Sequence, residues 1–588
     1  MPSESLPLPP ASADASVRTF APSPSHDVNT DEYSQYDSYA QDHLPARQKW
    51  PHLLFDLPHL HYPHQLNCVE ELLGAAALAR FGDRIAIRSP RHCWSYREFA
   101  QQVDAIALAL LQDAHVRPGM RVLLRAANTP EAAACLLAII KIGAIAVPTM
   151  PMLRARELSA ILLKSKAELA ICGSDLLEEL EMARQISDAS QTRLWLLDTG
   201  AAASNHVSAQ LNAQANEQPN ELPSVLACAA RKHGACPAYA SRADTICLLA
   251  FTSGTTGRPK ATVHFHRDLL TISDCFPRSH LRLQADDVMI GTPALAFTFG
   301  LGGLLFFPLR YGAATVLQSY ASAEDLWQAI AHYQATICFS APTFYRKMAL
   351  SSAREVQPAS LRYAVCAGEA LSPTTRQLWQ TKVGLIDGLG STEMLHIFVS
   401  AAGEDVREGA IGRAIPGYQV AILDHHGQPC ALGTRGRLAV RGPTGCRYLD
   451  DERMAEYVQG GWNITGDTCS MDEDGYVYYH GRNDDMIISS GYNIAPCEVE
   501  EVLLQHPAVQ ECAVLGAPDS ERGQIVQAFV VLHPGIAASN ALQDDLQDFM
   551  KTELAPYKYP RQIHFLRSLP RTSSGKLQRF ALRDAALA

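Results

Sequence analysis

The sequence predicts a large α/β N-terminal domain with layered sheets and helices, followed by a smaller α+β C-terminal domain. Three observations support this fold class. The chain has 588 residues, which is too long for one hydrophobic core and predicts roughly two to four domains. From Trp50 onwards, apolar strand-like runs alternate with helical runs, as in α/β units with buried sheets. After about Arg482 this alternation gives way to a compact mixed pattern.

The N-terminal part contains the clearest α/β units. Residues 84–88 and 121–125 are short apolar runs that predict strands. Residues 130–142 predict an apolar helix, and residues 144–147 predict the strand that follows it. The polar stretch 198–223 is rich in Ala, Asn, Gln and Ser and predicts a surface insertion.

One stretch, residues 288–309, carries no charge over 22 residues and is long enough to cross a bilayer. It contains four glycines and two prolines, which predict a short strand, a loop and a helix start instead. We therefore expect buried core here, and a protein that does not bind a membrane.

The C-terminal part predicts a separate small domain. Residues 498–505 and 542–554 predict helices, and residues 511–515 and 525–532 predict strands. Together they make an α+β unit of about 100 residues, which is enough for an independent core. We expect a disordered tail at 1–48, an N-terminal domain at 49–482 and a C-terminal domain at 483–588.

Composition limits the function classes. The formal net charge is −11 and there is no long Lys/Arg run, which disfavours a nucleic-acid-binding protein. The 15 cysteines are scattered without Cys-x-x-Cys pairs and indicate reduced, mostly buried thiols of a cytoplasmic protein. The N-terminus lacks a basic segment followed by an apolar block, so we expect no secretory signal.

A glycine- and hydroxyl-rich loop follows the apolar strand predicted at 248–251. Glycines let backbone N–H groups turn towards one point, and hydroxyls and cations add donors, so the loop suits a triphosphate. Its spacing matches neither a Walker A loop nor a dinucleotide-binding fingerprint. The residues predicted to bind phosphate are Thr252, Ser253, Gly254, Thr255, Thr256, Gly257 and Lys260.

This loop resembles the signature of the adenylate-forming superfamily of acyl- and aryl-CoA ligases, adenylation domains and luciferases. Four further segments match that superfamily in order and spacing. They are Gly388–Glu393 (GLGSTE), Trp462–Asp467 (WNITGD), Gly481–Gly491 (GRNDDMIISSG) and Pro570–Lys576 (PRTSSGK). The resemblance covers the chain from about Trp50 to the C-terminus, and it implies that the C-terminal domain is mobile.

The resemblance implies roles for the nucleotide-binding residues. Thr392 would donate to the α-phosphate of ATP, and Glu393 would bind Mg²⁺, which prefers carboxylate and phosphate oxygens. Leu389 stands where many relatives place an aromatic ring, so we expect aliphatic packing against adenine. The nucleotide side would be completed by Gly368, Glu369, Ala370, Asp387, Gly388, Leu389, Gly390 and Ser391.

The last two motifs would serve the two half-reactions. Asp467 would accept hydrogen bonds from the ribose hydroxyls, supported by Arg482. Asp484 would be the hinge of the small domain, although an Asp here is also compatible with a helix or turn cap. Gly491 would line the thiol tunnel, where a Cβ has no room, and Lys576 would bridge the substrate carboxylate and the α-phosphate.

The predicted acyl pocket has aromatic and small residues. The run Gly390–Ile397 resembles that of benzoate-type CoA ligases, and the entry segment 50–58 is similar to that of the 2-aminobenzoate-CoA ligase group. His396 would either bond an ortho substituent of an aromatic ring or form a wall of the pocket. The expected pocket residues are Phe297, Thr298, Phe299, Gly300, Ala367, His396 and Ile397.

The resemblance therefore implies an ATP-dependent, AMP-forming ligase that joins an aromatic acid to coenzyme A, with Mg²⁺ as cofactor. A stand-alone enzyme that loads a carrier-protein thiol is the alternative. A catalytically dead nucleotide-binding homologue is a third hypothesis, disfavoured because Glu393, Asp467 and Lys576 are all present. We expect no nucleic-acid or membrane partner, a cytoplasmic location, and a monomer or homodimer.

Overall fold

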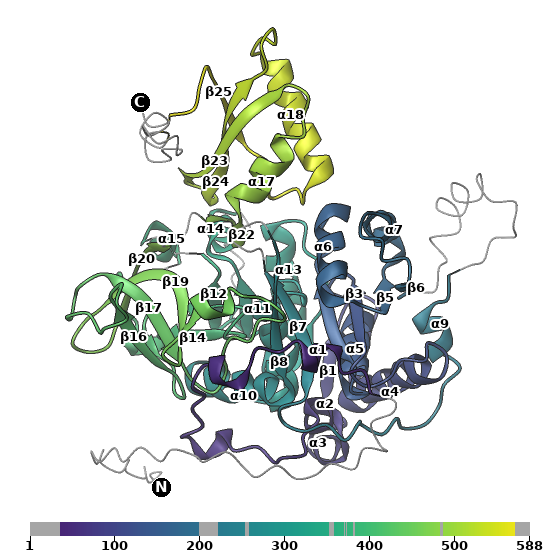
Figure 1. The fold of residues 1–588 in the computed structure, drawn as a ribbon. Coiled ribbons are helices and arrows are strands. Elements are labelled where there is room, and N and C mark those ends of the chain that lie inside the picture. Colours follow the sequence, from purple (N-terminus) through teal and green to yellow (C-terminus); the bar gives the residue numbers. More distant parts are fainter. Residues whose placement is uncertain are drawn as a thin grey trace, which may run out of the picture. The chain divides into compact units, whose positions relative to one another are not determined.

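The computed structural model describes residues 36–198, 222–252, 258–351, 358–369, 371, 373–379, 383–482, 486–570 and 582. Figure 1 shows the order of their helices and strands. They form a large α/β region and a smaller α+β region at the C-terminal end, so the predicted fold class is confirmed.

Two large sheets dominate the described part of the N-terminal region. The six-stranded sheet has the order β6 (Arg193–Leu196), β5 (Leu169–Cys172), β3 (Arg121–Arg125), β4 (Ile145–Thr149), β7 (Ile246–Thr252) and β8 (Lys260–Phe265). The nine-stranded sheet has the order β15 (Arg413–Ala414), β14 (Ile397–Ser400), β13 (Gly384–Gly390), β12 (Tyr363–Ala367), β11 (Ile337–Ser340), β9 (Val288–Gly291), β10 (Ala314–Val316), β1 (Ile85–Arg88) and β2 (Cys93–Ser95). Most neighbouring strands are parallel, which explains their continuous apolar runs.

The side chains of each large sheet contribute to two different cores. In β3, Val122 and Leu124 pack into one hydrophobic core and Leu123 into another, as the two-residue period of a strand requires. The first core is shared with the nine-stranded sheet, where Met289 belongs to it while Val288 and Ile290 face a third. Each large sheet is therefore covered on both faces.

Helices provide these covering layers. The shared core contains α2 (Cys68–Leu73), α4 (Tyr96–Gln112), α5 (Pro130–Lys141) and α10 (His266–Phe276). The outer face of the six-stranded sheet packs against α6 (Ala155–Ser165) and α7 (Leu177–Ile186), which lie side by side in Figure 1. The outer face of the other sheet packs against α13 (Ala323–Tyr333) and α14 (Pro342–Leu350). Shorter helices are α3 (Ala75–Phe81), α9 (Val225–Ala229), α11 (Thr298–Leu301), α12 (Phe307–Tyr311), α15 (Pro373–Leu378) and α16 (Met454–Tyr457).

The predicted helix at 130–142 illustrates how local sequence sets these elements. Thr129 caps α5 by accepting a hydrogen bond from the N–H of Ala132, and Pro130 occupies the first turn, where its missing N–H costs nothing. The helix is buried on almost every side, which accounts for its apolar composition.

Two smaller sheets complete the described fold. One contains β16 (Gln419–Leu423), β17 (Gly436–Arg441), β19 (Trp462–Met471), β18 (Val458–Gln459) and β20 (Val477–Arg482). The C-terminal sheet contains β22 (Tyr492–Ile494), β21 (Ile487–Ser489), β24 (Gly523–Leu532), β23 (Val509–Asp519) and β25 (Gln562–Leu566). It packs against α17 (Pro496–Leu503) and α18 (Asn540–Glu553) around a core of its own. The bounds of these helices, and of β23 and β24, overlap the ranges predicted from the sequence.

The N-terminal boundary differs from the sequence prediction. Residues 1–35 lie outside the described ranges, but α1 (Tyr39–Asp42) and a short 3₁₀ helix at Arg47–Lys49 are ordered. Ala40 is buried, and Asp37 forms an ion pair with Arg121 of β3 at 2.5 Å. The prediction of a tail at 1–48 is therefore wrong for residues 37–48, because these contacts pair distant parts of the chain.

The charge-free stretch 288–309 is core, as predicted. It forms β9, a loop, α11, a π-helix at Gly302–Phe306 and the start of α12; most of it is buried, and the partly exposed residues lie in the loop and the start of α11. Among the described helices, none has both the length and the apolar character needed to cross a bilayer. Most of the polar insertion predicted at 198–223 lies outside the described residues.

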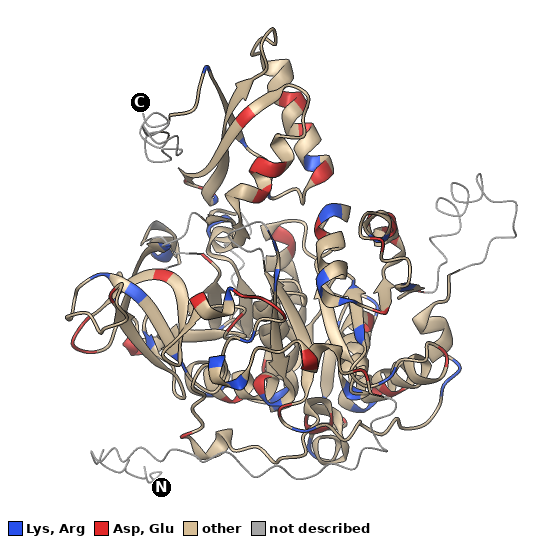
Figure 2. Cartoon of the chain, in the orientation of Figure 1, with Lys and Arg blue, Asp and Glu red and all other residues tan. Residues whose placement is uncertain are grey.

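Charge and cysteine distribution agree with the composition. Figure 2 shows Lys and Arg mixed with Asp and Glu over the described elements. All 15 cysteines are free thiols, and eleven of them, such as Cys135 and Cys338, are buried.

Candidate active site

A cavity of about 870 Å³ collects residues from several of the sequence motifs. It is bordered by the C-terminal ends of parallel strands, where open α/β sheets commonly bind ligands. The sequence-predicted residues that line it are Thr252, Phe297, Thr298, Phe299, Ala367, Gly368, Gly390, Ser391, Thr392, His396, Ile397 and Gly491.

One end of the cavity has aromatic walls. The ring centroids of Phe299 and His396, which both line the cavity, are 5.6 Å apart, and the ring of Phe307, which does not line it, packs against the imidazole with a centroid distance of 4.6 Å. Gly302 makes this packing possible, since a Cβ there would come within 2.6 Å of the imidazole. Gly300 is also constrained, because its Cβ would meet the carbonyl oxygen of Ala294 at 2.2 Å.

His396 is the polar group of this aromatic end. Its side chain is 3% exposed, and neither ring nitrogen makes a hydrogen bond of normal geometry with the described residues. Burial among apolar rings disfavours the charged imidazolium and lowers the pKa of His396 to about 3. The pocket therefore presents a neutral imidazole that can both donate and accept a hydrogen bond.

The turn that follows β13 carries Thr392 and Glu393. The hydroxyl of Ser391 accepts a hydrogen bond from the N–H of Met394 at 3.2 Å, and the carbonyl of Thr392 accepts one from the N–H of Leu395 at 3.1 Å. Leu395 has a φ of 70°, which is costly for a bulky side chain. The turn places Thr392 on the cavity wall and buries Glu393 behind it.

Glu393 is linked through a tyrosine to Lys260, one of the residues predicted to bind phosphate. The phenol of Tyr448 donates to Oε1 of Glu393 at 2.5 Å, and Nζ of Lys260 donates to the same phenol oxygen at 3.4 Å. A buried carboxylate near Lys260, which is predicted to bind phosphate, fits Mg²⁺, because this ion takes one or two protein carboxylates together with substrate phosphates. Tyr448 was not predicted from the sequence.

Four predicted nucleotide-binding residues, Asp387 to Gly390, lie along β13 itself. Asp387 is only partly exposed, and desolvation raises its pKa to about 6 although Arg376 lies 4.0 Å away. Gly388 cannot carry a side chain without displacing Ile397, whose Cδ1 would be 2.4 Å from a Cβ. Leu389 is half-buried and packs against the shared core.

The predicted ribose pair is brought together by strand register. Asp467 of β19 lies opposite Arg482 of β20, and Nη1 of Arg482 donates to Oδ1 of Asp467 at 3.3 Å. Asp467 is 6% exposed, so a carboxylate is held in place beside a cation. Neither residue lines the cavity.

Gly368 and Gly491 approach one another at the cavity wall. A Cβ on Gly368 would lie 3.5 Å from the carbonyl oxygen of Gly491. A Cβ on Gly491 would lie 3.3 Å from the Cβ of Ala341. Both glycines have positive φ, 93° and 82°, which other residues rarely adopt. Glu369 accepts a hydrogen bond from the N–H of Thr343 at 2.7 Å.

Several predicted residues cannot be placed. Ser253, Gly254, Thr255, Thr256, Gly257, Ala370, Asp484 and Lys576 lie outside the described residues. Their proposed roles remain predictions from the motifs.

The structure also reveals an ionic group that the sequence did not suggest. Lys558 is 3% exposed and forms ion pairs with Glu157 of α6 and Glu498 of α17, the second at 2.6 Å. All three residues border the cavity. Since they are 60 and 401 residues apart along the chain, no local pattern indicates the pairing.

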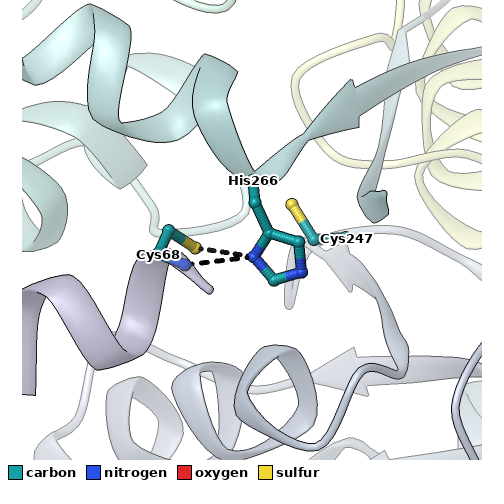
Figure 3. Close-up of side chains that lie close together, drawn as sticks. All are labelled: Cys68, Cys247 and His266. Atoms are coloured by element: carbon teal, nitrogen blue, oxygen red, sulfur yellow. Dashed lines mark hydrogen bonds between the residues drawn. The ribbon is translucent and has the colours of Figure 1, made fainter. Parts of the chain in front are cut away.

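A cluster of two cysteines and a histidine lies elsewhere in the core (Figure 3). The possible ligand atoms of Cys68, Cys247 and His266 are within 4.8 Å of one another, and all three side chains are buried. Nδ1 of His266 accepts the N–H of Cys68, the first residue of α2, at 3.2 Å. Because this lone pair is used, we assign the cluster to the packing of α2. None of the three residues lines the cavity.

Comparison with known families agrees with the motifs. The family model described as AMP-binding enzyme matches residues 75–448, and the model of the AMP-binding enzyme C-terminal domain matches residues 498–576.

Individual relatives extend over nearly the whole chain. The chain is 33% identical over 536 residues to the benzoate–CoA ligase of Thauera aromatica, covering 90% of this chain and 98% of the relative. It resembles the crystal structure of the anthranilate CoA ligase AuaEII in complex with anthranoyl-AMP, with a TM-score of 0.67, 32% identity, and coverage of 90% and 98%. It also resembles a benzoate CoA ligase from Burkholderia xenovorans LB400, with a TM-score of 0.63, 29% identity, and coverage of 88% and 100%.

Proposed function

We propose that this chain, which belongs to the AMP-binding enzyme family, activates an aromatic carboxylic acid of the benzoate or 2-aminobenzoate type. Within that family it is an AMP-forming acid–CoA ligase that uses ATP, Mg²⁺ and coenzyme A. The aromatic substrate class is supported by the aromatic part of the cavity wall that Phe299 and His396 form, with Phe307 packed against His396.

The shape of this cavity end favours a flat ring. The rings of Phe297, Phe299 and His396 line the cavity together with the small residue Ala367, and Gly302 and Phe307 pack against the imidazole. An aryl group can stack against or meet the edges of such rings, whereas a flexible chain would lose conformational entropy there. A neutral His396 can also bond an amino or hydroxyl group next to the carboxylate.

The mechanism follows from the charges to be handled. The substrate carboxylate attacks the α-phosphate of ATP, pyrophosphate leaves, and an acyl-adenylate remains. Thr392 donates to the α-phosphate, Lys260 neutralises phosphate charge, and the Asp467–Arg482 pair holds the ribose. Glu393 would hold Mg²⁺, which supplies charge neutralisation at the phosphates. Gly491 then leaves room for the thiol of coenzyme A, which displaces AMP to form the thioester.

A substrate panel tests this function. The purified chain, with ATP, Mg²⁺ and coenzyme A, should convert benzoate or 2-aminobenzoate to the thioester and release AMP and pyrophosphate. Medium-chain fatty acids of equal carbon number should react much more slowly, because they lack the flat ring. Faster turnover of the fatty acids would overturn the aromatic assignment, and release of ADP and phosphate would overturn the adenylation chemistry.

The same panel distinguishes the alternative acceptor. An enzyme that loads a carrier protein would catalyse ATP–pyrophosphate exchange with the aromatic acid but form no product with free coenzyme A. We favour coenzyme A because the named relatives covering most of the chain are CoA ligases.

The neutral state of His396 predicts a pH dependence of stability. Its pKa falls from the ordinary 6.5 to about 3 on folding, so between these values the unfolded chain binds the proton and the folded chain does not. Stability is therefore lost as the pH falls below 6.5. At pH 5 the titration of His396 lowers the free energy of unfolding by about 2 kcal/mol compared with its value well above pH 6.5.

The free energies of unfolding of wild type and His396→Phe, compared from about pH 5 to pH 7, measure this pH-dependent loss of stability. The gap in stability between the two proteins should shift in favour of the variant as the pH falls. The exposed His425→Phe serves as the matched control and should show no such shift. A constant gap between wild type and His396→Phe would mean that His396 is not held neutral.

A further inference from the structure

The turn that carries Thr392 and Glu393 is held from outside by a histidine. Nε2 of His264, at the end of β8, lies 2.9 Å from the carbonyl oxygen of Thr392. A carbonyl can only accept, so Nε2 carries the proton and donates. The same carbonyl accepts the N–H of Leu395, so the imidazole binds the peptide unit around which this turn closes.

This support matters because the turn is strained. Leu395, with its φ of 70°, adopts a conformation that persists only where the surrounding structure imposes it. Besides the imidazole, the hydroxyl of Thr444 donates to the carbonyl of Met394 at 2.8 Å. Two side chains from outside the turn therefore donate hydrogen bonds to its main-chain carbonyls, one on either side of Glu393.

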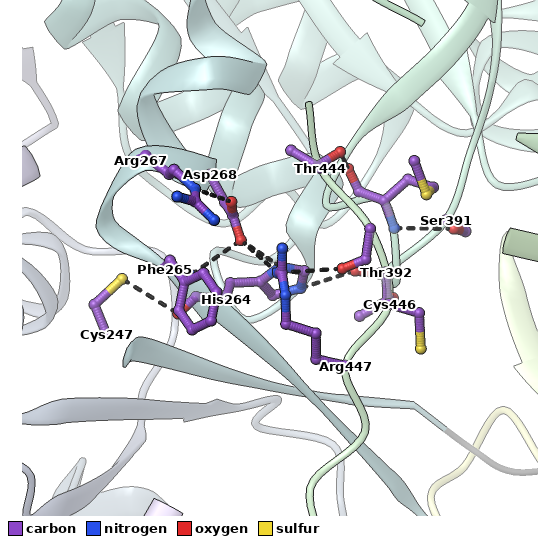
Figure 4. A network of polar contacts seen from close by, with 12 residues as sticks. Cys247, His264, Phe265, Arg267, Asp268, Ser391, Thr392, Thr444, Cys446 and Arg447 are labelled. Atoms are coloured by element: carbon purple, nitrogen blue, oxygen red, sulfur yellow. Dashed lines mark hydrogen bonds and ion pairs between the residues drawn. The ribbon is translucent and has the colours of Figure 1, made fainter. Parts of the chain in front are cut away.

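The imidazole lies beside a buried ion pair (Figure 4). Nδ1 of His264 lies 3.9 Å from Oδ2 of Asp268, which accepts from Nη1 of Arg447 at 3.0 Å and from the N–H of Phe265 at 3.1 Å. His264, Asp268 and Arg447 are all completely buried. The Arg447 guanidinium is the largest charge favouring the carboxylate and, despite burial, the pKa of Asp268 is lowered to about 2.

Arg447 belongs to a segment that frames the same turn. The chain at 444–449 runs beside β8, where the N–H of Val263 donates to the carbonyl of Arg447 at 2.8 Å and the N–H of Leu449 donates to that of Ala261 at 2.9 Å. Its neighbour Tyr448 bonds the carboxylate of Glu393. The backbone that carries the phosphate loop is thus tied to both Thr392 and Glu393.

We propose that His264 is a positioning residue for adenylation. Through the Thr392 carbonyl it fixes the side chains of Thr392 and Glu393 relative to the phosphate loop that precedes β8, and the buried Asp268–Arg447 pair lies beside its ring. The inference rests on the proposed function, since these two side chains are taken to face the α-phosphate and Mg²⁺. It predicts a role in the first half-reaction and none in the transfer of the acyl group to the thiol.

The test compares His264→Leu, His264→Gln and the matched control His266→Leu. His266 is equally buried two residues away, but it contacts Cys68. His264→Leu should slow ATP–pyrophosphate exchange about 10- to 100-fold, because small displacements of reacting groups are costly, and should raise the Mg²⁺ concentration needed for half-maximal exchange. Thioester formation from supplied aryl-adenylate should match the wild type. His264→Gln keeps a donor and should recover much of the exchange rate and the wild-type Mg²⁺ dependence.

The control separates positioning from stability. His266→Leu should lower the melting temperature without changing the ratio of the two half-reactions or the Mg²⁺ dependence. The inference is overturned if His264→Leu retains the exchange rate and Mg²⁺ dependence of the wild type, or slows both half-reactions equally, or if glutamine restores nothing in a folded protein. Absence of exchange in the wild type with every acid tested would instead overturn the proposed function, and the inference with it.

Discussion

Glu393→Gln is expected to slow adenylation about 10²- to 10³-fold, the usual cost of losing one group aimed at transition-state charge. Glutamine keeps the size of the side chain and can still accept the hydrogen bond from Tyr448, so the fold should be preserved. It lacks the negative charge that a hard cation requires. Single-turnover formation of the aryl-adenylate, measured over a range of Mg²⁺ concentrations, should show a lower rate and a higher half-saturating concentration.

Two variants make this result specific. Glu404→Gln changes the same charge at an exposed position and should behave as wild type. Tyr448→Phe removes the hydroxyl that bonds Glu393 but leaves the carboxylate, so it should slow adenylation much less than Glu393→Gln. An unchanged Mg²⁺ dependence in Glu393→Gln would show that another group binds the metal.

Gly491→Leu is expected to have the opposite effect, blocking thioester formation by about 10²-fold or more while sparing adenylation. A Cβ at this position lies 3.3 Å from the Cβ of Ala341, and a longer side chain must occupy the cavity. Rapid-quench measurement of each half-reaction tests this, with supplied aryl-adenylate for the second.

The strain of a positive φ needs its own control. Gly475 has a φ of 80°, close to that of Gly491, but a Cβ there has no neighbour within 4 Å. Gly475→Leu should therefore show the same backbone cost without a change in either half-reaction. Lys576→Ala gives the reciprocal comparison, since its motif predicts loss of adenylation with thioester formation retained. If Gly491→Leu slowed both steps equally, the cavity beside it would not be the thiol path.

Much of the fold could be predicted because the parallel strands are buried on both faces. Runs such as residues 121–125 and the capped helix after Thr129 carry their signals within a few residues. The N-terminal boundary could not be predicted in this way. The pairing of Asp37 with Arg121 joins distant segments, and the composition around Asp37 resembles that of a tail.

The candidate site, like the fold, contains residues that the sequence predicts and residues that it does not. Its motif residues could be predicted by resemblance: many of those in the described ranges line the cavity and Asp467 pairs with Arg482, whereas Asp387, Gly388, Leu389 and Glu393 do not line the cavity. The residues that hold the motifs in place were missed. His264 binds a main-chain carbonyl, so the type of the partner residue gives no sign of the contact. Arg447 is completely buried, although an arginine in a sequence usually indicates a surface position.

The contacts around the Thr392–Glu393 turn also bear on when the site forms during folding. The turn is 128 residues from His264, and Arg447 is 179 residues from Asp268. Closing such long loops costs chain entropy before any contact is gained, so nucleotide affinity should appear late in refolding, after the sheets have assembled. A ligand that recognises only the finished site stabilises the native state by mass action, about 2.7 kcal/mol at a hundred times its Kd. ATP present during refolding would therefore act on the last step and leave the early ones unchanged.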